Sequence, residues 1–135
     1  MKPAILLLAV LPLLAGCFGG SGPTLYSVSG TVSYTGKPLT AGHVAFTEEE
    51  ASDGTQERLV HVGEIVNGKF QARVSAGKKR VEIYGSYETG RMVPDEMGEK
   101  EVPERGGIPA QYNSETTLEV TIPQGGMKDL AFDLE

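Results

Sequence analysis

The chain has 135 residues, with 12 lysines and arginines against 18 aspartates and glutamates, which gives a formal net charge of −6. A length of this order predicts one domain. Proteins that bind a phosphate backbone need clustered lysines and arginines, so the acidic balance argues against nucleic acid as a partner. The 18 glycines and 8 prolines favour frequent turns over long helices, and 39% apolar residues are enough for a globular core.

The first residues have the pattern of a secretory signal. Lys2 provides a positive charge, and residues 4–15 form an uncharged stretch of 12 residues rich in leucine and alanine. This stretch is shorter than the ~20 apolar residues that a transmembrane helix needs, whereas an apolar stretch of about 7–15 residues after a positive start is typical of a signal peptide. We therefore expect residues 1–16 to be cleaved off and to take no part in the fold.

Leu14, Ala15, Gly16 and Cys17 end this stretch, and together they resemble the lipobox of bacterial lipoproteins. The resemblance implies that Cys17 receives a diacylglyceryl group and that the chain is cleaved just before it, after which the new amine is acylated, for example with palmitate. Two or three acyl chains anchor a protein firmly, because each buried methylene contributes ~0.8 kcal/mol. The alternative is an ordinary signal peptide with a chance cysteine nearby.

The residues around Cys17 refine this expectation. Residue 18 is Phe18, not the aspartate that retains many lipoproteins in the inner membrane, so the resemblance favours the outer membrane. Residues 17–24 then form a lipidated cysteine and a flexible, glycine-rich tether. Cys17 is the only cysteine, so the folded part, residues 25–135, has no disulfide, zinc–thiolate site or cysteine nucleophile.

From residue 25 onward, apolar residues recur at every second position, which is typical of half-buried strands. Asn67 and Gly68 predict a type I′ hairpin turn after the third expected strand, residues 59–66. The register of this strand is open, because Ile65 lies on one of its faces while Val60 and Val62 lie on the other. Seven short strands at this spacing predict an all-β fold, a seven-stranded antiparallel β-sandwich. The seven expected strands are residues 26–34, 43–47, 59–66, 70–74, 80–84, 117–122 and 130–134.

The order of glycines and strand residues also resembles the carboxypeptidase regulatory-like domains, which have the transthyretin-like (prealbumin-like) sandwich. Lys79 stands where that family usually has an aromatic residue. The resemblance implies a non-catalytic folding, spacing or binding module. It is carried by Gly30, Val32, Gly36, Pro38, Leu39, Gly42, Val44, Phe46, Asn67, Gly68, Phe70, Gly77, Val81, Ile83, residues 108–113, Leu118, Phe132, Asp133 and Leu134.

Catalytic and metal chemistry find little support in the sequence. His43 and His61 are the only imidazoles, 18 positions apart, and strand alternation predicts that both point outward. The acidic residues 48–50 and Asp53 indicate a solvated connection, with calcium binding as the alternative. We therefore expect no catalytic residue, metal or cofactor and no enzymatic activity. The alternative function is a small hydrolase or metal-dependent enzyme on the transthyretin-like scaffold, which would need both imidazoles and two carboxylates in one pocket.

Residues 87–117 form an unusually long connection between expected strands. We expect a packed crossover stiffened by Pro94, Pro103 and Pro109, and the alternative is a binding loop, because connections beyond ~15 residues are usually functional or disordered.

The sequence therefore predicts an exported, lipid-anchored and non-enzymatic β-sandwich that acts as a binding or structural component of the bacterial cell envelope. Its expected partners are the membrane, through the lipid on Cys17, and an envelope protein or glycan of unknown identity. A further possibility is that the domain adds an edge strand to a partner. The residues expected at a partner surface are Tyr84, Tyr87, Arg91 and Tyr112.

Overall fold

The computed structural model describes residues 22–49 and 58–135. The expected signal peptide (residues 1–16), the expected lipidation site Cys17 and the acidic residues Glu50 and Asp53 lie outside the described residues. In the part of the chain that is described, no helix combines the length and the apolar character needed to cross a membrane.

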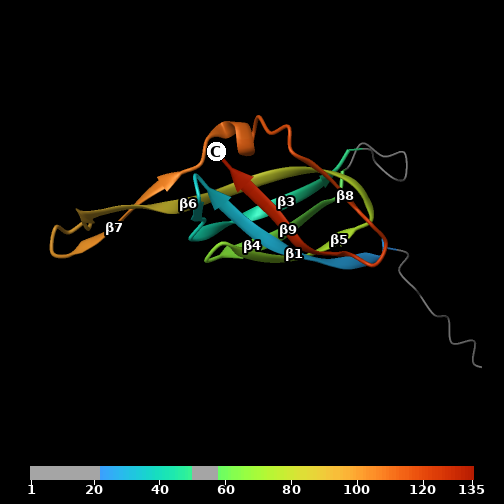
Figure 1. The fold of residues 1–135 in the computed structure, drawn as a ribbon, viewed down its shortest axis with the longest axis horizontal. Helices are drawn as coiled ribbons and strands as arrows, with labels where there is room; N and C mark the ends of the chain where they lie inside the picture. The colour runs from blue at the N-terminus through green and yellow to red at the C-terminus, as the bar shows by residue number, and fades with distance from the viewer. Residues whose placement is uncertain (1–21, 50–57) are drawn as a thin grey trace, which may run out of the picture.

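The described residues form an all-β fold, as the sequence predicts (Figure 1). All seven expected strands are present, and two further strands, β2 and β7, were not predicted. The elements are β1 (Leu25–Tyr34), β2 (Lys37–Pro38), β3 (Ala41–Glu48), β4 (Val60–Val66), β5 (Lys69–Ser75), β6 (Gly77–Pro94), β7 (Glu101–Gly107), a short 3₁₀ helix (Ala110–Tyr112), β8 (Glu119–Ile122) and β9 (Met127–Leu134).

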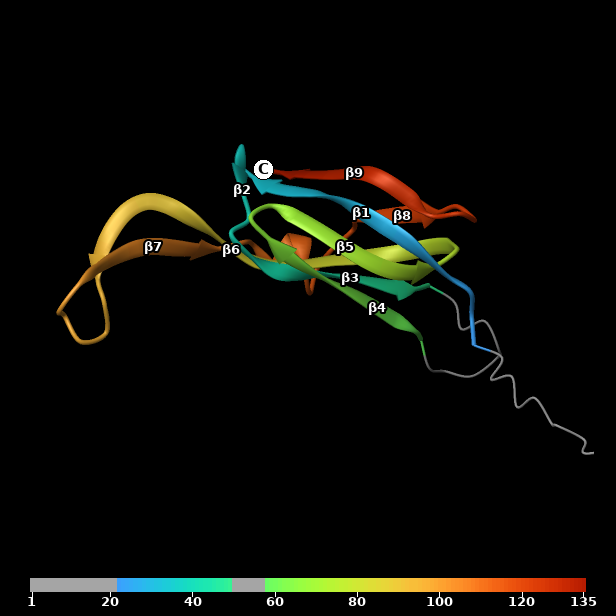
Figure 2. The same cartoon turned by 90° about the horizontal axis from the view of Figure 1, so that it is seen from below.

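The strands join in one sheet, in the order β2-β1-β5-β4-β3-β6-β7, with β9 beside β1 and β8 beside β6. Every pair is antiparallel except β1 and β9, which are parallel. Only residues 123–126 connect β8 to β9, so these strands are at most ~18 Å apart where the connection joins them. Because β8 and β9 belong to opposite margins of the sheet, the sheet must curl strongly into a half-barrel, as Figure 2 shows.

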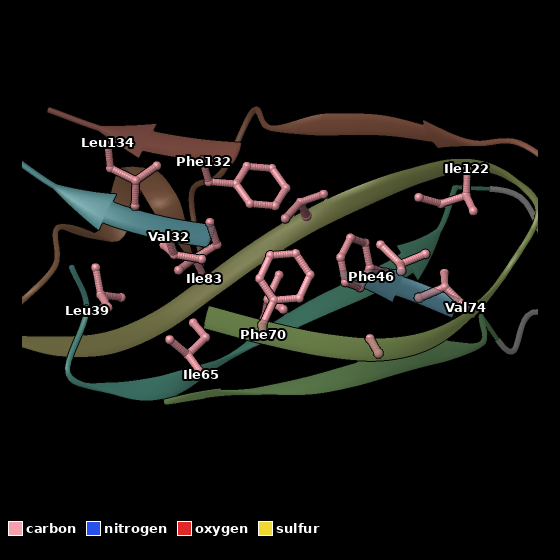
Figure 3. Packing of buried hydrophobic residues seen from close by; sticks show 14 residues of the cluster. Val32, Leu39, Phe46, Ile65, Phe70, Val74, Ile83, Ile122, Phe132 and Leu134 are labelled. Carbon is pink, nitrogen blue, oxygen red and sulfur yellow. The ribbon is translucent and has the colours of Figure 1, made fainter. Parts of the chain in front are cut away.

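The concave side of the curled sheet holds the core (Figure 3). The register left open by the sequence is settled here, because Ile65 is fully buried while Val60 and Val62 are 53% and 58% exposed on the convex side. Burying a side chain such as Phe46 or Ile83 contributes ~1.5–3 kcal/mol. The core cluster consists of Val28, Val32, Leu39, Val44, Phe46, Ile65, Phe70, Ala72, Val74, Val81, Ile83, Ile122, Phe132 and Leu134.

Gly30 lets the last strand pack against the first. A Cβ atom at this position would lie 1.8 Å from the carbonyl oxygen of Leu130, so only glycine allows the β1 and β9 backbones to approach this closely. The parallel pairing of β9 with β1, which covers the core at this margin, therefore depends on a residue without a side chain.

We expect Gly30→Ala to lower the free energy of unfolding by ~1–3 kcal/mol, because the added methyl group must push the two backbones apart. Urea unfolding followed by circular dichroism measures this loss. The matched control is Gly107→Ala, since a Cβ at Gly107 would meet nothing within 4 Å. Equal losses in the two variants would contradict the role given to Gly30.

Candidate functional site

The long strand β6 belongs to the core in its first half and leaves the body in its second half. Its pairing with β3 ends at Ser86, opposite Ala41. Beyond this point β6 pairs with β7, and Figures 1 and 2 show the two strands projecting from the curled sheet as a hairpin. We call residues 87–107 the arm. The expectation of a packed crossover is therefore wrong for these residues.

The rest of the long segment does pack on the body. Ile108 and Tyr112 lie against the core cluster, and the Thr116 hydroxyl donates a hydrogen bond of 2.8 Å to the carbonyl oxygen of Val81. The prolines of the arm do not prevent its two strands from pairing. Pro94 is the last residue of β6, and Pro103 lies in β7, an edge strand that pairs with β6 alone. An edge strand tolerates proline because the N–H groups on its outer side have no partner strand.

A bulge bends the arm near its base. Three residues of β6, residues 89–91, face Glu104 of β7 alone. Gly90 has a φ angle of +90°, which glycine adopts without the steric cost that a side chain would add. Two extra residues on one strand increase the local bend, so the bulge redirects the outer half of the arm.

The carboxylate of Glu104 holds this bulge together. It accepts a hydrogen bond of 2.7 Å from Thr89 Oγ1, and Arg91 donates to it through both Nε and Nη2 at 2.8 Å. The Thr89 hydroxyl and the Arg91 guanidinium keep the pKa of Glu104 below its ordinary value. Glu104 therefore stays ionised and holds Thr89 and Arg91, the two residues on either side of Gly90.

The tip of the arm is a tight turn that presents one apolar side chain. The Asp95 N–H donates to the Lys100 carbonyl at 2.7 Å, and the Asp95 carboxylate accepts from the Glu99 N–H at 2.9 Å. Met97 stands between them and is 78% exposed, the largest exposed fraction among the large apolar side chains that the structure describes.

A cluster of three tyrosines fixes the base of the arm. The Tyr34 ring lies 5.0 Å from the Tyr87 ring and 6.2 Å from the Tyr112 ring, measured between centroids. The Tyr112 hydroxyl hydrogen-bonds to the carbonyl oxygen of Glu135 and accepts the Glu135 N–H at 3.0 Å. The cluster thus connects β6, β1 and the C-terminus.

Of the four residues expected at a partner surface, the structure brings Tyr87 and Tyr112 together through Tyr34, which the sequence analysis treated only as a strand residue. Arg91 lies further out on the arm, in contact with Glu104. Tyr84 lies apart from them, on the convex face of the sheet, where its ring stacks on His43 at 4.9 Å.

A small open hollow of about 260 Å³ lies beside the base of the arm. Lys37 in its wall donates to the carbonyl oxygens of Thr89 at 3.1 Å and Glu88 at 3.5 Å. Lys37 therefore links β2 to the bulge. Sequence reasoning missed this link because nothing local to Lys37 points to a segment 51 residues away.

At the other end of the core, the structure contains a buried polar cluster that the sequence did not predict. Glu48 and Lys79 lie opposite each other in β3 and β6 and are 7% and 2% exposed. The Glu48 carboxylate accepts from Lys79 Nζ at 3.2 Å and from Ser75 Oγ at 2.7 Å. His61 Nε2 lies 3.2 Å from Ser75 Oγ and donates to it, because Ser75 directs its own hydrogen to Glu48.

The expectations that Glu48 belongs to a solvated connection and that His61 points outward are therefore wrong. The alternation of β3 continues through Glu48, which puts this residue on the concave side with Phe46. His61 follows the same alternation on β4, since it lies opposite Phe46. Sequence reasoning assigned Glu48 by the acidic run that it begins, and it assigned His61 by taking its neighbours Val60 and Val62 as the inward residues of the strand.

The pKa shifts fit a structural role for the cluster. Burial by itself would raise the pKa of Glu48, but hydrogen bonds from Ser75 and Lys79 and the charge of Lys79 keep it below its ordinary value. Burial and the charge of Lys79 lower the pKa of His61, and Glu48 opposes them only in part. The fold therefore stabilises an ionised Glu48 beside a neutral His61.

The two histidines do not share a site. His43 is exposed on the convex face, whereas His61 lies on the concave side, so the pocket that the enzymatic alternative requires does not form around them. Within residues 22–49 and 58–135, no three histidine, cysteine, aspartate or glutamate side chains gather in a way that could hold a metal ion.

Comparison of the chain with family models, with curated proteins and with solved structures finds no match. The geometry of the arm and of the body therefore carries the functional argument.

We expect Glu48→Gln to lower the free energy of unfolding by ~3–5 kcal/mol, because it leaves the buried Lys79 ammonium without its charged partner. The double variant Glu48→Gln/Lys79→Met should lose less, since it removes both charges. Urea unfolding measures both losses. The matched control is Glu82→Gln, whose 3.6 Å pair with Arg80 is partly exposed and should contribute less than ~1 kcal/mol. A double variant less stable than Glu48→Gln would contradict this assignment.

We expect Glu104→Ala to loosen the arm and leave the core unchanged, because Glu104 contacts only arm residues. Backbone amides of residues 89–105 should exchange hydrogen faster, and the melting temperature should stay within a few degrees of the unsubstituted chain. Hydrogen exchange with mass spectrometry measures the first effect and calorimetry the second. Glu101→Ala, on the same strand, is the control, and it should leave the exchange rates unchanged.

Proposed function

We propose that the chain is an exported lipoprotein whose β-sandwich domain serves as a non-enzymatic binding module of the cell envelope, with the arm as its binding element. The observation that carries the proposal is the placement of the arm at one end of the sheet while the chain enters at the other end, as Figure 1 shows. The curled sheet is, in this proposal, a transthyretin-like sandwich extended by β2 and by the arm.

The separation of the two ends follows from β1. This strand starts at Leu25 and ends at Tyr34, which contacts Tyr87 at the base of the arm. Ten residues of strand span ~30 Å. Cys17 lies eight residues before Leu25, a reach of at most ~29 Å. A lipid on Cys17 would therefore hold the start of β1 within ~29 Å of the membrane, and the arm would lie at the end of the body that is farther from the anchor.

The side chains of the arm support binding through its surface in preference to strand addition. Pro94 and Pro103 have no N–H groups, which blunts the edges of the arm against pairing with another strand. Met92 and Met97 are 54% and 78% exposed, and flexible thioether side chains adapt well to a partner surface. In this proposal the methionines contact the partner, while Tyr87 and Tyr112 support the arm from its base.

The anchoring part of the proposal is tested by Cys17→Ser in the full chain with its own leader. We expect the variant to lose palmitate labelling and to leave the membrane fraction, because no acyl chain can attach to serine at this position. Metabolic labelling and cell fractionation measure both effects.

The matched control moves the thiol out of the lipobox, as Cys17→Ser/Ser21→Cys, and it should not restore the label. A Cys17→Ser protein that is still cleaved, labelled and membrane-associated would refute the lipoprotein proposal. A parent chain that is cleaved but carries no label would favour an ordinary signal peptide.

A further inference from the structure

The convex face of β4 is apolar and uncovered. Val60, Val62 and Val66 point outward and are 53%, 58% and 52% exposed. The inward residue Ile65 of the same strand is fully buried, so β4 carries apolar side chains on both of its faces. Strands of this kind normally have both faces covered, whereas a strand with one face in water alternates apolar and polar residues. The pattern of β4 therefore fits a strand whose outer face is covered by another molecule.

The arm is the second place where large apolar side chains are exposed. Met92, Met97 and Val102 are 54%, 78% and 39% exposed. Together with Leu59 and the three outward valines of β4, they make up seven of the nine exposed large apolar side chains in the described residues. Scattered exposed apolar residues need no explanation, but a concentration in two patches marks interaction surfaces.

One molecule cannot bring its own two patches together. The arm leaves the body where β6 passes the end of β3 at Ser86, and it extends away from the β4 face, as Figures 1 and 2 show. The tyrosine cluster and Lys37 hold its base in this direction. Within residues 22–49 and 58–135, no segment therefore covers the outward valines of β4, and the arm of the same molecule is held away from them.

Charge discriminates among the ways in which two copies could meet. The outward positions of β5 beside β4 carry Lys69 and Arg73, and Glu64 is the one carboxylate on the outward side of β4. The arm carries three cations and six carboxylates, an excess of negative charge that includes most of its tip. Its carboxylates are Glu88, Asp95, Glu96, Glu99, Glu101 and Glu104, and its cations are Arg91, Lys100 and Arg105.

Two arms would repel each other, and two β4–β5 faces would bring their cations together, whereas an arm on a face joins opposite charges and apolar surfaces. We propose that the arm of one copy docks on the convex β4–β5 face of a second copy, with Met97 and Met92 on the outward valines and the acidic tip beside Lys69 and Arg73. Pro94 and Pro103 direct the contact to side chains by blocking strand addition.

This contact is heterologous, so each copy keeps a free arm or a free face, and further copies can add to the ends. The arm is a two-stranded hairpin, and we expect a contact through its outer half to bury less than the ~800 Å² per partner of a typical stable interface. Docking should therefore be weak between free molecules. The docking proposal rests on the proposed membrane anchor in one respect only. Chains held on one membrane meet at a high effective concentration, and this concentration would compensate for the weak docking.

The test uses the full chain with its own leader, expressed as two copies with different C-terminal epitope tags. A photo-crosslinking amino acid replaces Met97 in one copy. We expect an adduct that contains both tags, with the attachment point mapped by mass spectrometry to residues 60–73. The same amino acid in place of Lys128, an exposed residue of β9 outside both patches, is the control and should give no such adduct. An adduct with another protein alone, an attachment outside residues 60–73, or no adduct would overturn the proposal.

Two substitutions on the receiving copy test the chemistry of the contact. Lys69→Glu should reduce the adduct several-fold, and Glu96→Lys in the arm of the other copy should restore part of it, because the charges are then exchanged. Val62→Asp should abolish the adduct, while circular dichroism shows an unchanged fold, since Val62 is 58% exposed. A yield that neither substitution changes would overturn the proposal. Fractionation of the Cys17→Ser chain tests the membrane anchor, and the adduct tests the docking. The two results are independent, because the adduct can be measured in either the soluble or the membrane fraction.

Discussion

The parallel pairing of β9 with β1 is the constraint on which the rest of the structure depends. The last strand joins the first across the margin of the sheet, while the preceding strand β8 pairs with β6 at the opposite margin. A short connection between β8 and β9 forces the two margins together, and the sheet curls because its strands are covalently joined in this order. Phe132 and Leu134 then cover the core from β9, and Gly30 makes the contact possible by having no side chain.

The strand β6 connects this core to the arm. Val81 and Ile83 are fully buried in its first half, and the same strand continues past the end of β3 into the projecting hairpin. A rigid origin in the core gives the arm a fixed direction, which the tyrosine cluster and Lys37 reinforce. The bulge around Glu104 adds a bend whose hydrogen bonds lie entirely within the arm. The position of the arm is therefore set by the core, and its shape by local contacts.

The buried cluster of Glu48, Lys79, Ser75 and His61 closes the opposite end of the core. Among the described residues no buried side-chain polar atom lacks a hydrogen-bond partner, so the cluster is fully satisfied. A network of this kind specifies one register for β3 and β6, because a shift by one residue would move Glu48 and Lys79 to the convex side and leave polar groups without partners. The surfaces proposed for binding, by contrast, are made of exposed apolar side chains on β4 and the arm.

The sequence alone determined seven of the nine strands, since alternation with a period of two and turn residues such as Asn67 and Gly68 are local properties. It also determined the pattern of a lipobox at Cys17, which depends on four adjacent residues. It did not determine which face of β4 is buried, because apolar residues lie on both faces and only the neighbouring strands distinguish them. The arm was missed because β7 has little alternation of its own and pairs only with the extension of β6. The polar cluster and the Lys37 contacts were also decided by tertiary structure alone, because they join residues that are distant in the chain and meet only when the sheet curls.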